Sequence, residues 1–136
     1  MVSCGGQTTF IVSTEGEVWA AGSGQKGSLG LGPKTFSTQQ KFQKIEINAK
    51  FDWVASGFES SSAICKETGA VYVWGCAKYG MFGRIQQNVF TPLAIKARFH
   101  PVQPFMARNL WTIRYEKVII CAKIDLVLVN SRKVDK

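Results

Sequence analysis

Short extended runs separated by glycine-containing turns dominate the first part of the chain. An apolar-rich run at 8–13 is followed by the turn Thr14-Glu15-Gly16 and by a second run at 17–21. The segment 62–74 repeats the same order around Glu67-Thr68-Gly69. Two runs joined by a tight turn are typical of an antiparallel β-hairpin. The pattern therefore predicts two hairpins.

The second hairpin carries bulky apolar residues on both faces of one strand. Val71 and Val73 point one way in an extended strand, while Tyr72 and Trp74 point the other way. We therefore expect this strand to be packed on both sides.

The hairpins belong to an internal repeat. The window 2–32 aligns with 54–85 at a shift of 52, or 53 after a one-residue insertion. All five glycines of the second window meet a glycine of the first, which indicates a true repeat. We interpret the paired glycines as structural, because turns need positive φ and close backbone approach excludes a Cβ. The pairs are Gly5 with Gly57, Gly16 with Gly69, Gly22 with Gly75, Gly27 with Gly80 and Gly30 with Gly83.

The repeat resembles the regulator of chromosome condensation repeat. The motifs that carry this resemblance are VSCG at 2–5, GEVW at 16–19 and GSLGLG at 27–32, with VASG at 54–57, GAVYVWG at 69–75 and YGMFG at 79–83. The resemblance implies an all-β fold, a partial β-propeller of two to three antiparallel four-stranded blades. We expect repeat 1 at 1–53, repeat 2 at 54–105 and a degenerate or incomplete repeat 3 at 106–136, with a strand starting near Val118.

Propellers close with four to eight blades, so two or three blades leave strand edges unpaired. We expect the chain to self-associate unless further blades or a partner cover these edges. The run at 8–13 is the strand that we expect to pair with another chain. Both ends of the sequence cut into a repeat, which favours a piece of a longer repeat array.

Composition changes sharply after Gly83. All 13 glycines lie at or before it, and all five arginines follow it. Residues 1–83 hold seven Lys and six acids, a net charge of +1, whereas 84–136 hold ten basic residues and three acids, a net charge of +7. The segment 97–109 is predicted to be a loop, followed by a strand at 111–115. Its Arg98, His100 and Arg108 form a candidate basic contact surface for an acidic partner.

The sequence offers no set of catalytic or metal-binding residues. Four cysteines lack a CxxC pair, which argues against zinc and favours small buried side chains in a reducing compartment. His100 is the single histidine and has no partner visible in the sequence. The glycine-rich stretch 22–27 has no helix pattern after it, so a phosphate loop is not predicted. We expect no catalytic residue, no metal and no cofactor.

No apolar run approaches the roughly 18 residues of a membrane span, and no secretory signal is visible. We expect an intracellular protein, cytoplasmic or nuclear, without membrane contact.

Two functions of different classes follow. The first is a non-catalytic protein-interaction scaffold, whose partner is another protein or further propeller blades. The alternative, implied by the resemblance, is guanine nucleotide exchange on a small GTPase. Nucleic-acid binding has less support, since the basic residues are spaced by apolar ones rather than clustered.

Overall fold

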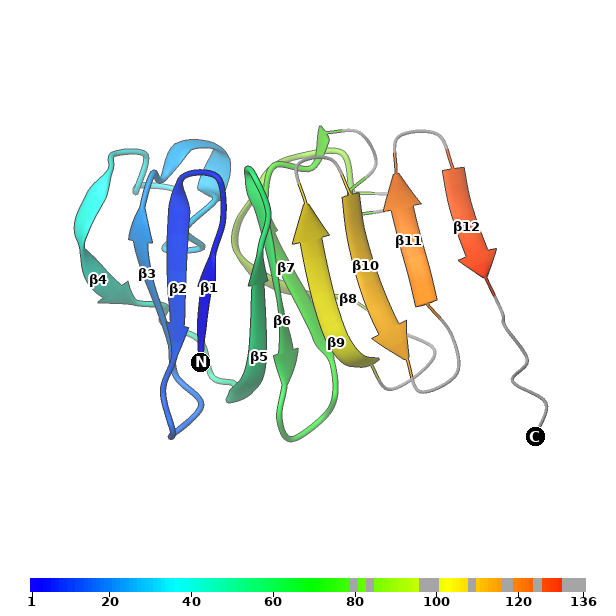
Figure 1. Cartoon of the computed structure of the whole chain (residues 1–136). Coiled ribbons are helices and arrows are strands. Elements are labelled where there is room, and N and C mark those ends of the chain that lie inside the picture. Colours follow the sequence, from blue (N-terminus) through cyan, green and yellow to red (C-terminus); the bar gives the residue numbers. More distant parts are fainter. Residues whose placement is uncertain are drawn as a thin grey trace.

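The computed structural model of the chain consists of sheets that follow one another in sequence order (Figure 1). The structure describes residues 1–78, 81–82 and 85–95 with their side chains, and the backbone of 101–107, 110–115, 119–123 and 126–130. In these residues there are three four-stranded antiparallel sheets, in which consecutive strands pair. Such an arrangement is a partial β-propeller, so the all-β prediction is confirmed.

The first two sheets have the same strand order. The first sheet contains β1 (Val2–Cys4), β2 (Thr8–Val12), β3 (Val18–Gly22) and β4 (Gln39–Lys44). The second sheet contains β5 (Phe51–Ser56), β6 (Ser60–Cys65), β7 (Val71–Gly75) and β8 (Val89–Ile95). A short 3₁₀ helix, η1 (Gln25–Gly27), lies between β3 and β4.

The third sheet contains β9 (Pro101–Ala107), β10 (Leu110–Tyr115), β11 (Ile119–Lys123) and β12 (Leu126–Asn130). The predicted loop at 97–109 was wrong for 101–107, which form β9. Proline is tolerated in this strand because β9 is the edge of its sheet and pairs only with β10. The strand expected near Val118 is β11, which is the third strand of its sheet and not the first.

The predicted repeat limits at 54 and 106 rest on sequence alignment and stay predictions. The sheets themselves begin at Val2, Phe51 and Pro101. In the described part of the chain, no helix is long and apolar enough to cross a membrane.

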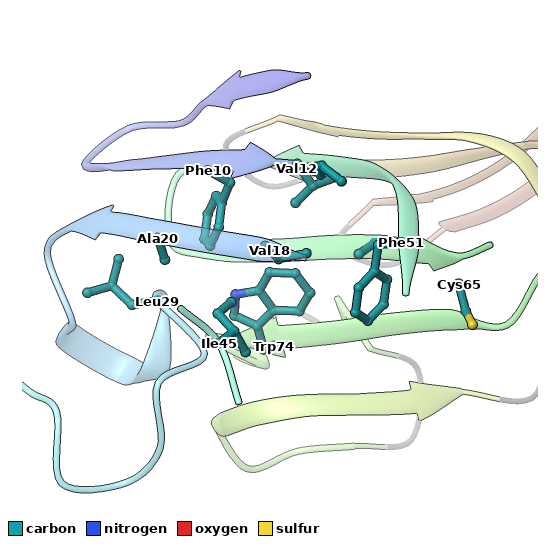
Figure 2. Close-up of a cluster of buried hydrophobic side chains, with 11 residues drawn as sticks. Phe10, Val12, Val18, Ala20, Leu29, Ile45, Phe51, Cys65 and Trp74 are labelled. Atoms are coloured by element: carbon teal, nitrogen blue, oxygen red, sulfur yellow. The ribbon is translucent and has the colours of Figure 1, made fainter. Parts of the chain in front are cut away.

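The main core lies between the first and second sheets (Figure 2). Alternate residues of β2 and β3 point toward the second sheet, because side chains on a strand alternate between its faces. Phe10 meets Trp74 edge to face, with ring centroids 5.5 Å apart. The buried side chains of this cluster are Phe10, Val12, Val18, Ala20, Leu29, Ile45, Phe51, Val54, Ala63, Cys65 and Trp74.

A second core covers the other face of the second sheet. Val71 and Val73 pack there with Ala55, Met81 and Phe82, and β9 contacts β5 and β6. The expectation that β7 is packed on both sides is thus confirmed, since Trp74 belongs to the first core and Val73 to the second.

The edges of the first sheet differ from those predicted. The run at 8–13 was expected to be adhesive, but β2 lies between β1 and β3 and its backbone pairs on both sides. The edges are β1 and β4, and β4 carries the exposed Lys41 and Lys44, which oppose edge-to-edge pairing. Cys4, expected to be buried, is exposed, because the face of β1 that carries it has no sheet against it in the described structure.

Gly30 lies directly against the indole ring of Trp74. Its φ is +70°, and a Cβ at this position would lie 3.0 Å from Trp74 Cδ1. Both the backbone conformation and the contact therefore favour glycine. A Cβ on Gly32, at φ +100°, would meet no described atom within 4 Å, so Gly32 shares only the conformational requirement.

We expect Gly30→Ala to lower the free energy of unfolding by roughly 1–3 kcal/mol, and by more than Gly32→Ala, because only the first displaces Trp74. Denaturant unfolding of the two variants measures the difference. Equal losses would show that backbone strain alone accounts for the effect.

Candidate protein-interaction surface

Two long and two short connections between strands lie at one end of the first two sheets. Because neighbouring strands alternate in direction, the segments 5–7, 23–38 and 57–59 and the described residues of 76–88 all lie at the upper edge of the sheets in Figure 1. We call the described residues of these four segments the loop face. Loops presented by a rigid scaffold commonly carry binding residues, so this end is the candidate functional site.

Equivalent backbone hydrogen bonds fix the loops in both repeats. Ser23 N donates to Gln7 O at 2.8 Å, and Cys76 N donates to Glu59 O at 2.9 Å. These pairs correspond under the repeat alignment. Each bond ties a long loop to the neighbouring short one, so the loop positions follow from the repeat.

The loop at 23–38 is also fixed to the second sheet. Trp74 Nε1 donates to Ser28 O at 3.1 Å, and Ser28 Oγ donates to Ser23 O at 2.5 Å. Further along the loop, Gly32 N donates to Phe90 O at 2.9 Å. The loop is therefore held by the same indole that fills the core.

A salt bridge joins the loops of the two sheets. Lys26 Nζ lies 2.6 Å from Glu59 Oε1, and both side chains are about one-third exposed. Lys26 has φ +55°, the one positive φ of a non-glycine residue in the part of the chain that the structure describes. A left-handed conformation is unfavourable for lysine. Lys26 nevertheless adopts this conformation, with its ammonium group beside the Glu59 carboxylate.

Two phenylalanines of the loop face are open to solvent. Phe36 is 58% exposed and Phe58 is 38% exposed. Phe36 is held from one side by Phe90, with ring centroids 5.7 Å apart. Lys34 and Lys78 are exposed on the segments 23–38 and 76–88 of the loop face. The loop face thus combines ordered aromatic side chains with positive charge, which suits contact with an acidic protein surface.

The groups with shifted pKa values lie at the opposite end of the sheets. A hydrogen bond from Lys44 Nζ, 2.9 Å from Glu17 Oε1, lowers the pKa of Glu17, and Lys50 adds to this at 3.6 Å. The same hydrogen bond raises the pKa of Lys44. Burial raises the pKa of the Cys65 thiol. Hydrogen bonds involving Thr68 together lower it by more, so the net shift of this pKa is downward. These groups lie beside the turns at that end and are not part of the loop face.

Among the residues with described side chains, no group of three His, Cys, Asp or Glu could hold a metal ion. The expected absence of an enzymatic site stays a prediction.

The predicted site residues fall into two groups. The glycines lie at turns and loop junctions, and a Cβ on Gly22 or Gly75 would collide with the carbonyl oxygen of Gln7 or Glu59 respectively. The other described glycines of the set are Gly5, Gly16, Gly27, Gly30, Gly57 and Gly69. Gly80, Gly83, Arg98, His100 and Arg108 lie outside the described residues, so the basic contact surface stays a prediction.

Sequence reasoning missed the loop face. Phe36 and Phe58 are aromatic residues within stretches that otherwise read as loops, and this was the available signal. The pattern alone could not show that segments so far apart along the chain end side by side.

Known proteins share this sequence pattern over part of the chain. Residues 2–28 match the Regulator of chromosome condensation (RCC1) repeat. The chain is 39% identical over 83 residues to the Ultraviolet-B receptor UVR8 of Arabidopsis thaliana, a match that covers 60% of the chain and 18% of the receptor. It is 36% identical over 89 residues to the X-linked retinitis pigmentosa GTPase regulator of Mus musculus, covering 64% of the chain and 9% of that protein. The chain thus spans less than a fifth of these relatives.

Solved structures share the fold. Human WBSCR16 superposes with a TM-score of 0.83 at 18% identity, over 96% of this chain and 35% of that one. Prp20p from Saccharomyces cerevisiae, whose binding to Gsp1p and histones has been studied, superposes with a TM-score of 0.67 at 19% identity, over 79% of this chain and 28% of that one.

Sequential four-stranded antiparallel sheets, with loops fixed by repeated glycines, define this protein as part of a β-propeller. Within it, residues 2–28 carry the regulator of chromosome condensation (RCC1) repeat.

The strained lysine gives a matched pair of variants. Lys26→Ala and Lys26→Gly both remove the side chain, but only glycine relieves the positive φ. We expect Lys26→Gly to be more stable to unfolding than Lys26→Ala by about 1 kcal/mol. Chemical denaturation of both variants tests this, and equal stabilities would mean that the backbone at position 26 is not strained.

Proposed function

We propose that this chain is a non-catalytic protein-interaction scaffold and that the loop face is its contact surface. The observation that carries the proposal is the pair Phe36 and Phe58, exposed on loops that backbone and indole hydrogen bonds hold in place. Ordered aromatic side chains can enter a partner's pocket with little loss of conformational entropy.

The partner we propose has an acidic surface with an apolar recess. Lys34 and Lys78 on the loop face meet the acidic groups, while the phenylalanines fill the recess. The binding of Prp20p to Gsp1p and histones supports a protein partner for this fold. Arg98, His100 and Arg108 belong to the proposal as a second basic contact, on the charge of their segment alone.

The alternative is exchange of guanine nucleotide on a small GTPase. Two observations favour keeping it: a relative is a GTPase regulator by name, and a neighbour in fold binds Gsp1p. Exchange would work by inserting a surface that displaces the nucleotide, so it needs no catalytic side chain. Nucleic-acid binding is less favoured, because the basic residues of 84–136 are spaced by apolar ones rather than clustered.

One experiment separates the two functions. Purified small GTPases loaded with a fluorescent guanine nucleotide are mixed with the chain, and both complex formation and nucleotide release are followed. A scaffold is expected to leave the release rate unchanged whether or not a complex forms. A saturable acceleration of release of roughly tenfold or more, about 1.4 kcal/mol in barrier height, would establish exchange instead.

A variant pair tests the surface itself. For any partner found, Phe36→Ser combined with Phe58→Ser is expected to weaken binding at least about tenfold, the effect of losing hot-spot aromatics. Leu93→Ser removes an exposed apolar side chain from β8, outside the loop face, and is expected to bind as wild type. Binding that survives the double variant would place the contact surface elsewhere.

A further inference from the structure

The two exposed phenylalanines of the loop face belong to different repeats. Phe36 lies on the long segment 23–38 that follows β3 of the first sheet, and Phe58 lies in the short turn between β5 and β6 of the second. An exposed ring on a loop samples several rotamers unless neighbouring atoms limit them. For each of these two rings, a residue of the other repeat lies in contact with it.

The ring of Phe58 lies against the backbone of Gly6, in the first repeat. Gly6 N donates to Gly57 O at 2.9 Å, which holds the two short turns together. A Cβ on Gly6 would collide with Phe58 Cδ2, and the three atoms nearest to it would all belong to Phe58. The φ of Gly6 is not positive, so the close approach of the ring favours glycine here, and the backbone conformation does not require it.

The ring of Phe36 lies against Phe90 of β8, in the second repeat. The two rings meet edge to face, with centroids 5.7 Å apart. Phe90 O also accepts a hydrogen bond from Gly32 N at 2.9 Å, and a Cβ on Gly27 would lie 2.9 Å from Phe90 Cδ1. The long loop of the first repeat therefore contacts Phe90 at three points along its length.

Gly6 and Phe58 occupy the same position of the repeat. The turns that contain them close with the same backbone hydrogen bond, 2.8 Å long, which Gly5 donates to Thr8 in the first repeat and Gly57 donates to Ser60 in the second. The first copy thus has no side chain where the second has a phenyl ring. Because that side chain is missing, the ring of the second copy can lie across the turn of the first.

Phe90 also differs from its counterpart in the first repeat. The first residues of β4 and β8 pair with Gly22 and Gly75, which are equivalent glycines. The second residues of these strands, Gln40 and Phe90, are therefore equivalent as well. Gln40 is exposed, whereas Phe90 is half-buried. Both contacts thus depend on residues in which the two copies differ, so the repeat pattern alone does not account for them.

We propose that Gly6 and Phe90 are positioning residues of the loop face, each belonging to one repeat and fixing the exposed phenylalanine of the other. This inference rests on the proposed function, in which Phe36 and Phe58 enter a partner's recess. The spacing of the two rings is then set by the junction between the repeats. A partner meets a pair of rings that is already ordered, so binding them costs little conformational entropy.

Fluorine NMR follows the position of each ring without any partner. The full chain is labelled with para-fluorophenylalanine, and the signals of Phe36 and Phe58 are assigned by replacing each with leucine. We expect Gly6→Ala to shift the Phe58 signal and to leave the Phe36 signal in place. Phe90→Leu keeps an apolar side chain but removes the ring, and is expected to do the reverse. Leu93→Ala changes an exposed residue of the same strand and is expected to shift neither signal.

A double-mutant cycle on unfolding tests whether Gly6 acts through Phe58. We expect Gly6→Ala to lower the equilibrium constant for folding severalfold in the wild-type chain and by clearly less in a Phe58→Ala background, where the added Cβ no longer meets a ring. An equal loss in both backgrounds would mean that Gly6 has a structural role independent of Phe58, and would overturn its assignment as a positioning residue.

The fluorine signals also separate this inference from the proposed function. An unmoved Phe58 signal in Gly6→Ala, an unmoved Phe36 signal in Phe90→Leu, or equal shifts of both rings in either variant would overturn the inference. If each ring moves as expected but the Phe36→Ser, Phe58→Ser double variant binds its partner as wild type does, the positioning role holds and the loop face is not the contact surface.

Discussion

The contact between Trp74 and the first sheet is the interaction on which the rest of this structure depends. The indole lies 1% exposed between the sheets, meets Phe10 edge to face, and leaves room only for glycine at position 30. Its nitrogen donates to Ser28 O, so the same side chain that fills the core also satisfies a buried carbonyl of the long loop. Sheet packing and loop position are therefore coupled.

That coupling also fixes the loops of the proposed binding surface. The loops are fixed by backbone hydrogen bonds that recur in both repeats, and a strained lysine adds a salt bridge between them. Exposed side chains such as Phe36 then project from a rigid base. In repeat proteins each unit contacts mainly its neighbours, so the apolar face of a sheet is buried by the sheet next to it. In the described structure the reverse face of the first sheet has no such neighbour, and its side chains are exposed or half-buried.

Errors in the sequence-based expectations have physical causes. Proline and basic residues made 97–109 read as a loop, but an edge strand tolerates proline because one side of its backbone needs no partner. The run at 8–13 was expected to be an exposed edge because it was taken as the first strand of the nearly neutral N-terminal repeat. A three-residue strand before it, β1, pairs with it and makes it central. Strands this short carry too little pattern to be recognised alone.

The sequence by itself determined the repeat, the hairpins and their all-β class, because turn glycines and alternating apolar residues act over a few neighbouring positions. Gly16 and Gly69 mark their turns wherever the sheets lie. Only the tertiary structure decided which faces are covered and which loops meet. Val2 and Val54 are equivalent positions of the repeat, yet one is bare and the other buried, since exposure depends on the neighbouring sheet. The approach of Lys26 to Glu59, 33 residues apart, likewise depends on sheets stacking side by side.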